Sequence, residues 1–140
     1  TDEDRAEFES RTKMLIEQYD EFSPLEGLHV NGEFTQGENI GDLGGVSISL
    51  KAYQISLKGK PSPVLDGFSG EQRLLIAYGQ LWQKKIRDEA LRNQIATDPH
   101  APAEYRVNGV VRNVPEFYEL FDVSAENKLS LAEDLRVKIW

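Results

Sequence analysis

Cysteine is absent from the 140 residues, and the chain has only two histidines and one methionine. Disulfide bonds and thiolate metal sites are therefore excluded. No apolar run approaches the roughly 20 residues that a membrane-spanning helix needs, and no segment resembling a signal peptide opens the chain. Basic residues are few, since 16 lysines and arginines face 24 acids and give a formal net charge of -8. Nucleic-acid binding is not expected, because phosphate contacts need clustered lysine and arginine.

Length and composition are those of one compact domain, with 39% hydrophobic and 29% charged residues. Thr1 is followed by three acids, the pattern of a helix N-cap with negative charge in the first turn. Because the chain opens directly on this cap, without an initiator methionine or a leader, we expect further sequence upstream.

Most of the chain is predicted to be helical. Four segments have apolar residues at helical spacing: residues 2–22, 38–57, 70–82 and 87–97. Ser69 and Gln72 form a capping box at the start of the third segment. We find no internal repeat, and the fold class is mainly α.

The remaining segments are rich in proline and glycine. Residues 23–37, 58–68 and 98–113 are predicted to be loops for this reason. Asn113 with Pro115 predicts the cap of a short helix that ends near Phe121. Alternating apolar residues in 136–140 predict a short strand or an anchored terminus.

Glu38 and Asp42 are spaced four residues apart near the predicted start of the second helix, so both carboxylates face the same way. Acids at a helix start can simply complement the helix dipole. An E-x-x-x-D pair can also supply a metal ligand and a carboxylate that orients a histidine ligand. The spacing alone leaves both interpretations open.

A second group of polar residues surrounds His100, which lies in a stiff segment between Pro99 and Pro102. Asp98 is close enough to accept a hydrogen bond from the imidazole ring. Arg106 offers a fork of donors suited to carbonyl or carboxylate oxygens. The alternative is a solvated surface loop. The other histidine, His29, has no such neighbours.

Together these segments resemble the neprilysin family of zinc metalloendopeptidases, which includes endothelin-converting enzyme and bacterial oligopeptidases. Four blocks carry the resemblance, in the family's order and with similar separations: residues 34–45 (FTQGENIGDLGG), 80–82 (QLW), 97–109 (TDPH with YRVNG) and 139–140 (IW). The resemblance covers essentially the whole chain. It implies that residues 1–140 are the C-terminal helical part of a thermolysin-like zinc peptidase catalytic domain.

The resemblance also implies a role for each polar residue of the two groups. Glu38 matches the third zinc ligand, beside two histidines of an HExxH helix, and Asp42 matches the acid that hydrogen-bonds one of those histidines. His100 matches the histidine that stabilises the oxyanion of the tetrahedral intermediate, and Asp98 matches the acid that orients it. Arg106 matches the arginine that binds a backbone carbonyl of the substrate.

Leu81 and Trp82 match residues that line the family's apolar pocket for the substrate side chain after the scissile bond, with ordinary helix packing as the alternative. The implied activity is zinc-dependent hydrolysis of oligopeptides on the amino side of hydrophobic residues. The parent enzyme would bind one zinc ion. Besides oligopeptide substrates, the partner of residues 1–140 would be the missing N-terminal part of the same chain. A bacterial periplasmic or secreted location is favoured over the cytoplasm.

Two departures stand out. Gly41 occupies a position where the family usually has alanine, and HExxH does not occur in the 140 residues. The HExxH-bearing part and the family's second helical domain would therefore lie outside this chain, which alone would be inactive and would hold zinc weakly or not at all. The competing hypothesis is an acidic helical module, without catalytic activity, that binds a protein partner.

Overall fold

The computed structural model describes residues 1–139, which form helices and contain no β-sheet. The elements are α1 (Asp2–Asp20), α2 (Gly32–Ser56), α3 (Gly70–Leu81), α4 (Asp88–Thr97), α5 (Ala103–Val111), α6 (Pro115–Leu120) and a 3₁₀ helix, η1 (Glu133–Leu135). The prediction of a mainly α fold is confirmed. Within this range, no helix has both the length and the apolar character needed to cross a membrane.

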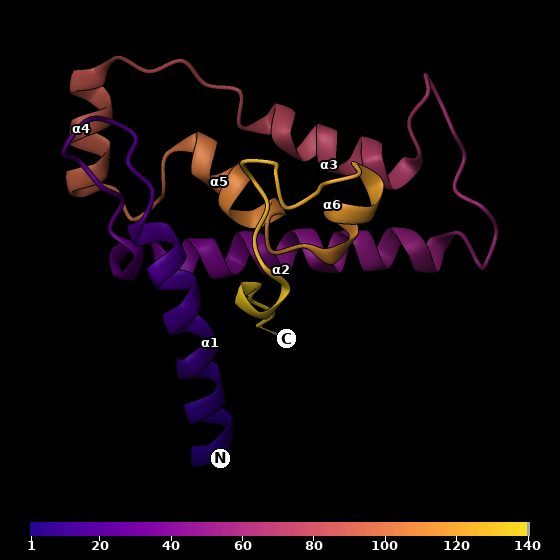
Figure 1. Cartoon of the computed structure of the whole chain (residues 1–140), viewed down its shortest axis with the longest axis horizontal. Helices are drawn as coiled ribbons and strands as arrows, with labels where there is room; N and C mark the ends of the chain where they lie inside the picture. Colours follow the sequence, from indigo (N-terminus) through magenta and orange to yellow (C-terminus); the bar gives the residue numbers. More distant parts are fainter. Residues whose placement is uncertain (140) are drawn as a thin grey trace.

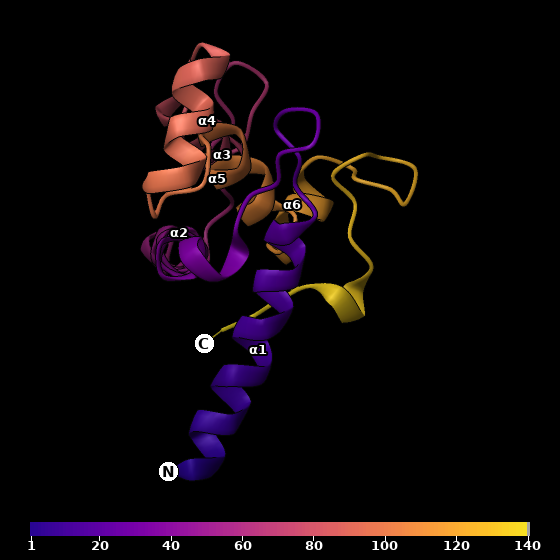
Figure 2. The ribbon, with the colours of Figure 1, turned by 90° about the vertical axis from the view of Figure 1, so that its left-hand side faces the viewer.

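The long helix α2 lies at the centre of the fold and contacts α1, α3 and α5. Figure 1 shows α3 running along α2, with α5 and α6 between them, while the N-terminal half of α1 projects away from the body. Figure 2 shows the same projection from the side. The core lies where these helices meet, and its largest fully buried apolar side chains are Leu15, Tyr19, Leu50, Val110 and Val114.

Helix α2 begins at Gly32, and the prediction of a start at Glu38 is wrong. Asn31 caps the helix by accepting a hydrogen bond from the Phe34 amide at 2.8 Å. Gly32 allows a close crossing with α1, because a Cβ atom there would lie 2.2 Å from the Ile16 carbonyl oxygen. Gly32 therefore serves helix packing, and the predicted loop is shorter than 23–37.

Residues 103–111 form helix α5, so the prediction of one continuous loop over 98–113 is wrong. Pro102 directly precedes the helix, where the missing N–H of proline does no harm. Gly109 lies inside the helix because the buried ring of Tyr19 packs on it: a Cβ atom would approach the ring to 2.6 Å. Gly109 therefore suggests a loop only when its distant neighbour Tyr19 is unknown.

Two glycine substitutions are expected to change stability in opposite directions. Gly41→Ala should stabilise the chain by about 0.4–1 kcal/mol, because the position is helical and a Cβ atom meets nothing within 4 Å. Gly109→Ala should destabilise it by about 1–3 kcal/mol, since the methyl group overpacks against Tyr19. Thermal unfolding of both variants beside the unaltered 140-residue chain would measure this. Equal shifts of the same sign would contradict the packing at Gly109.

Asn113 does not cap α6, contrary to prediction, because its side chain is buried. Its amide exchanges hydrogen bonds with Gln18 of α1 at 2.7 and 3.1 Å, and its Oδ1 accepts the Val137 amide at 2.7 Å. Val137 and Ile139 are buried. Of the two predicted forms of the C-terminal segment, the anchored terminus is therefore confirmed and the strand is wrong for residues 136–139. Trp140 of the IW landmark lies outside the described residues.

Candidate functional site

Glu38 and Asp42 lie well inside α2, on the side that faces α5. The alternative that they complement the helix dipole is therefore wrong, since this effect falls off within the first turn. The carboxylate of Asp42 is nearly buried, with 13% of its side chain exposed, whereas that of Glu38 is 45% exposed. Glu38 is thus the more accessible of the two.

His100 lies in the short segment between α4 and α5, and Asp98 holds it at two points. The Asp98 Oδ1 atom is 2.5 Å from the His100 Nδ1 atom and also accepts the His100 backbone N–H at 3.0 Å. These hydrogen bonds from His100 hold the pKa of Asp98 below its usual range. The predicted ring contact is confirmed, and it fixes the direction in which the opposite ring edge points.

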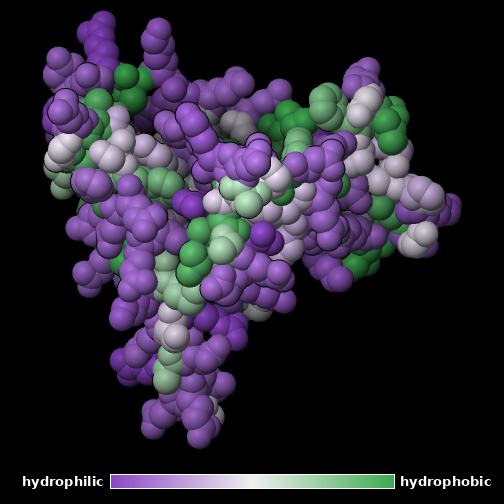
Figure 3. Space-filling model, viewed as in Figure 1, coloured by the Kyte–Doolittle hydropathy of each residue, from purple (hydrophilic) through white to green (hydrophobic). Residues whose placement is uncertain are grey.

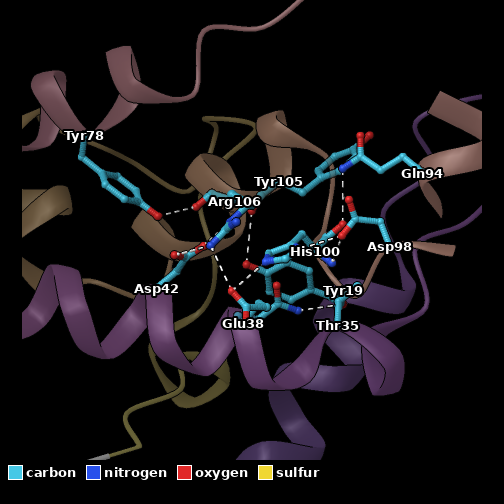
Figure 4. A network of polar contacts seen from close by, with 11 residues as sticks. Tyr19, Thr35, Glu38, Asp42, Tyr78, Gln94, Asp98, His100, Tyr105 and Arg106 are labelled. Atoms are coloured by element: carbon cyan, nitrogen blue, oxygen red, sulfur yellow. Dashed lines mark hydrogen bonds and ion pairs between the residues drawn. The ribbon is translucent and has the colours of Figure 1, made fainter. Parts of the chain in front are cut away.

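That opposite edge points at Glu38: the His100 Nε2 atom lies 3.1 Å from the Glu38 Oε2 atom. Both ring nitrogens therefore face carboxylate oxygens. Figure 4 shows the ring between Asp98 on one side and Glu38 on the other. The two polar groups of the sequence thus form one cluster.

Arg106 completes the cluster from α5. Its Nε and Nη2 atoms donate to the two carboxylate oxygens of Asp42 at 2.6 and 2.8 Å, and Nη2 lies 3.5 Å from Glu38. Hydrogen bonding to Asp42 raises the pKa of Arg106, so the guanidinium stays charged. Sequence reasoning did not predict the Asp42–Arg106 pair. Each carboxylate oxygen has a further lone pair, so Asp42 can still accept a bond from another residue.

Helix α3 and its C-cap residue Trp82 contribute aromatic and apolar side chains beside Arg106. The Trp82 ring lies over the guanidinium, with its centroid 4.0 Å from the Arg106 Cζ atom. The Leu81 side chain is 78% exposed, which contradicts the alternative that it is core packing. Tyr78, which sequence reasoning missed, donates its hydroxyl to the Arg106 carbonyl oxygen at 2.8 Å. Its spacing of four from Trp82 on one helix face is the signal that could have found it.

An apolar groove of about 460 Å³ runs between α2 and α3, next to the cluster. Asp42 lies at its edge, and small residues (Gly41, Gly45 and Ala77) form much of its lining. Leu81 lines the same groove. The cluster is therefore flanked by open apolar surface.

The whole chain matches a known family at the level of sequence. The model of Peptidase family M13 matches residues 1–137. The chain belongs to peptidase family M13. It is 36% identical over 142 residues to Neprilysin-1 of Caenorhabditis elegans, an alignment that covers 96% of this chain and 18% of that protein. It is 33% identical to a neutral endopeptidase of Lactobacillus helveticus, covering 100% of this chain and 20% of that protein.

Solved structures agree with this M13 membership. The crystal structure of the zinc metalloprotease Zmp1 of Mycobacterium tuberculosis in complex with an inhibitor superposes with a TM-score of 0.97 at 52% identity. The match covers 100% of this chain and 22% of Zmp1. The chain therefore has the fold of one segment of an M13 protein and spans about a fifth of the relatives that it matches.

Proposed function

We propose that the chain is the C-terminal part of the catalytic domain of a longer zinc metalloendopeptidase, which hydrolyses oligopeptides on the amino side of hydrophobic residues. The observation that carries the proposal is the meeting of Glu38, His100 and Arg106 within 3.5 Å contacts, although they come from α2, a loop and α5. M13 membership and a likeness to proteins named as endopeptidases support it.

The described residues can supply part of a zinc site. Glu38 offers an accessible carboxylate, a ligand type that catalytic zinc uses together with histidine. Residues 1–139 contain no group of three or more metal-binding side chains that could hold an ion by themselves. Two histidines of an HExxH motif in the remainder of the longer protein would complete the site. Bound there, zinc would act as a Lewis acid on the scissile carbonyl.

The other residues of the cluster would bind and polarise the substrate. His100, held by Asp98, can donate from Nε2 to the oxygen on which negative charge develops, in place of its present contact with Glu38. Arg106 uses Nε and Nη2 for Asp42, which leaves Nη1 to bind a backbone carbonyl of the peptide. Leu81 and Trp82 would line the pocket for the hydrophobic side chain after the scissile bond.

Exposed apolar surface is consistent with a longer protein. The groove between α2 and α3 borders Asp42, where the HExxH helix would pack. Further apolar side chains remain exposed on the connector between α2 and α3, among them Val64, Leu65 and Phe68. Figure 3 shows apolar atoms at that end of the molecule. An acidic interaction module would account for this surface but not for the polar cluster beside it, so we do not favour that alternative.

The proposal predicts different behaviour for the longer protein and for the 140-residue chain. The longer protein should bind about one zinc ion and cleave a quenched fluorescent peptide, whereas the 140-residue chain should do neither, because a catalytic zinc needs three protein ligands. Metal analysis after dialysis and the peptide assay, with a chelator as control, would test both. Stoichiometric zinc in the short chain, or a longer protein without chelator-sensitive cleavage, would refute the proposal.

A further inference from the structure

Tyr78 of α3 and the C-cap residue Trp82 contact Arg106 at its backbone and at its guanidinium group. The Tyr78 hydroxyl donates to the Arg106 main-chain carbonyl at 2.8 Å, while the Trp82 ring stacks on the guanidinium. The two aromatic rings lie one helical turn apart and contact each other edge to face, with centroids 6.4 Å apart. Helix α3 and its C-cap residue Trp82 therefore contact both the backbone and the charged end of Arg106.

The guanidinium is restrained by its neighbours on two sides. Asp42 pairs with it in the plane through two hydrogen bonds, and Trp82 covers one face. Only 12% of the Arg106 side chain is exposed. These contacts hold the guanidinium group. The position of the Arg106 backbone in α5 depends on other contacts.

Tyrosine hydroxyls fix that backbone from two helices. Tyr19 of α1 donates to the Tyr105 carbonyl at 3.2 Å, and Tyr78 of α3 donates to the next carbonyl, that of Arg106. Figure 4 shows the two rings approaching α5 from different sides. Tyr19 is fully buried in the core, whereas Tyr78 lines the groove beside Asp42. Burial raises the pKa of Tyr78, so the hydroxyl keeps the proton that it donates.

We propose that Tyr78 is a positioning residue, which acts through Arg106 to set the place where the substrate carbonyl is bound. This inference rests on the proposed peptidase function. A binding donor displaced by about 1 Å loses much of its effect on the reaction. The Tyr78 hydroxyl holds the first turn of α5 against α3 and so prevents such a displacement. The Arg106 carbonyl oxygen can accept this bond in addition to its helical hydrogen bond, because it has two lone pairs.

The test is Tyr78→Phe in the longer protein, which removes the hydroxyl and keeps the ring. KM should rise by about three- to tenfold, the effect of one lost hydrogen bond, with kcat and zinc content little changed. The control is Tyr118→Phe, which also removes the acceptor of the Leu131 amide at 2.9 Å. The Tyr118 hydroxyl donates to the Arg112 carbonyl at 2.7 Å, at the far end of α5 from the cluster. This control should lower the melting temperature without changing KM.

A double-mutant cycle separates positioning from direct contact with the peptide. Arg106→Ala should raise KM, and adding Tyr78→Phe to it should raise KM no further, because the hydroxyl then has no side chain to position. Effects that multiply in the double variant, or an unchanged KM in Tyr78→Phe, would overturn the role of Tyr78. Absence of zinc-dependent cleavage by the unaltered longer protein would instead overturn the proposed function, and this assignment with it.

Discussion

Replacing Glu38 with glutamine in the longer protein is expected to remove bound zinc and peptidase activity together. The substitution keeps the size of the side chain and its place on α2 but removes the anionic group that we propose binds zinc. Changes to residues that merely support metal ligands cost about 10- to 100-fold in affinity, so loss of the ligand itself should cost more than about 100-fold. Excess zinc should restore part of the rate, because the two proposed histidine ligands of the HExxH motif would remain. Zinc content after dialysis and cleavage rates at increasing zinc would be measured.

Glu33→Gln is the matched control for this experiment. Glu33 lies in the first turn of the same helix and is exposed, and no ion pair of residues 1–139 involves it. It should keep both zinc and activity. A Glu38→Gln protein that retained stoichiometric zinc would show that Glu38 is not a ligand. Its contacts with His100 and Arg106 would then be its whole role.

The parts of the fold that sequence predicted correctly depend on local signals. Ser69 and Gln72 form the predicted capping box, and Thr1 and Asp4 form another at the start of α1. The missed helix α5 depends on a distant contact. Gly109 is tolerated in that helix because Tyr19, far away in the sequence, occupies the space where a side chain would lie. No pattern within residues 98–113 contains this information.

In the candidate site, too, contacts between residues close in the sequence were predicted and contacts between distant residues were not. The shared face of Glu38 and Asp42 follows from their spacing on a helix, and the Asp98–His100 contact joins residues two positions apart. The pairing of Asp42 with Arg106 spans 64 positions and has no local signature. The same is true of the hydroxyl that Tyr78 directs at the Arg106 carbonyl. Sequence therefore predicts the members of the cluster but not how the arginine is held.

Replacing His100 with alanine is expected to lower kcat by about 100- to 1000-fold, the usual cost of one lost oxyanion donor. KM and zinc content should change little, since the proposed contact is made mainly in the transition state. Steady-state kinetics on a peptide substrate, with zinc measured on the same sample, would check both. This result would separate His100 from Glu38, whose replacement should lower zinc and activity together.

The control is His29→Ala, because His29 is the only other histidine of the 140 residues and lies exposed, with its Nδ1 atom 3.0 Å from the Asp20 carbonyl oxygen. It should leave kcat unchanged. Loss of zinc in His100→Ala would mean that the 3.1 Å contact with Glu38 supports the ligand and not the substrate. Full kcat with full zinc would mean that the Asp98–His100 pair is a structural contact of the loop before α5. Only a fall in kcat at constant zinc and KM fits an imidazole that Asp98 aims at the reacting carbonyl.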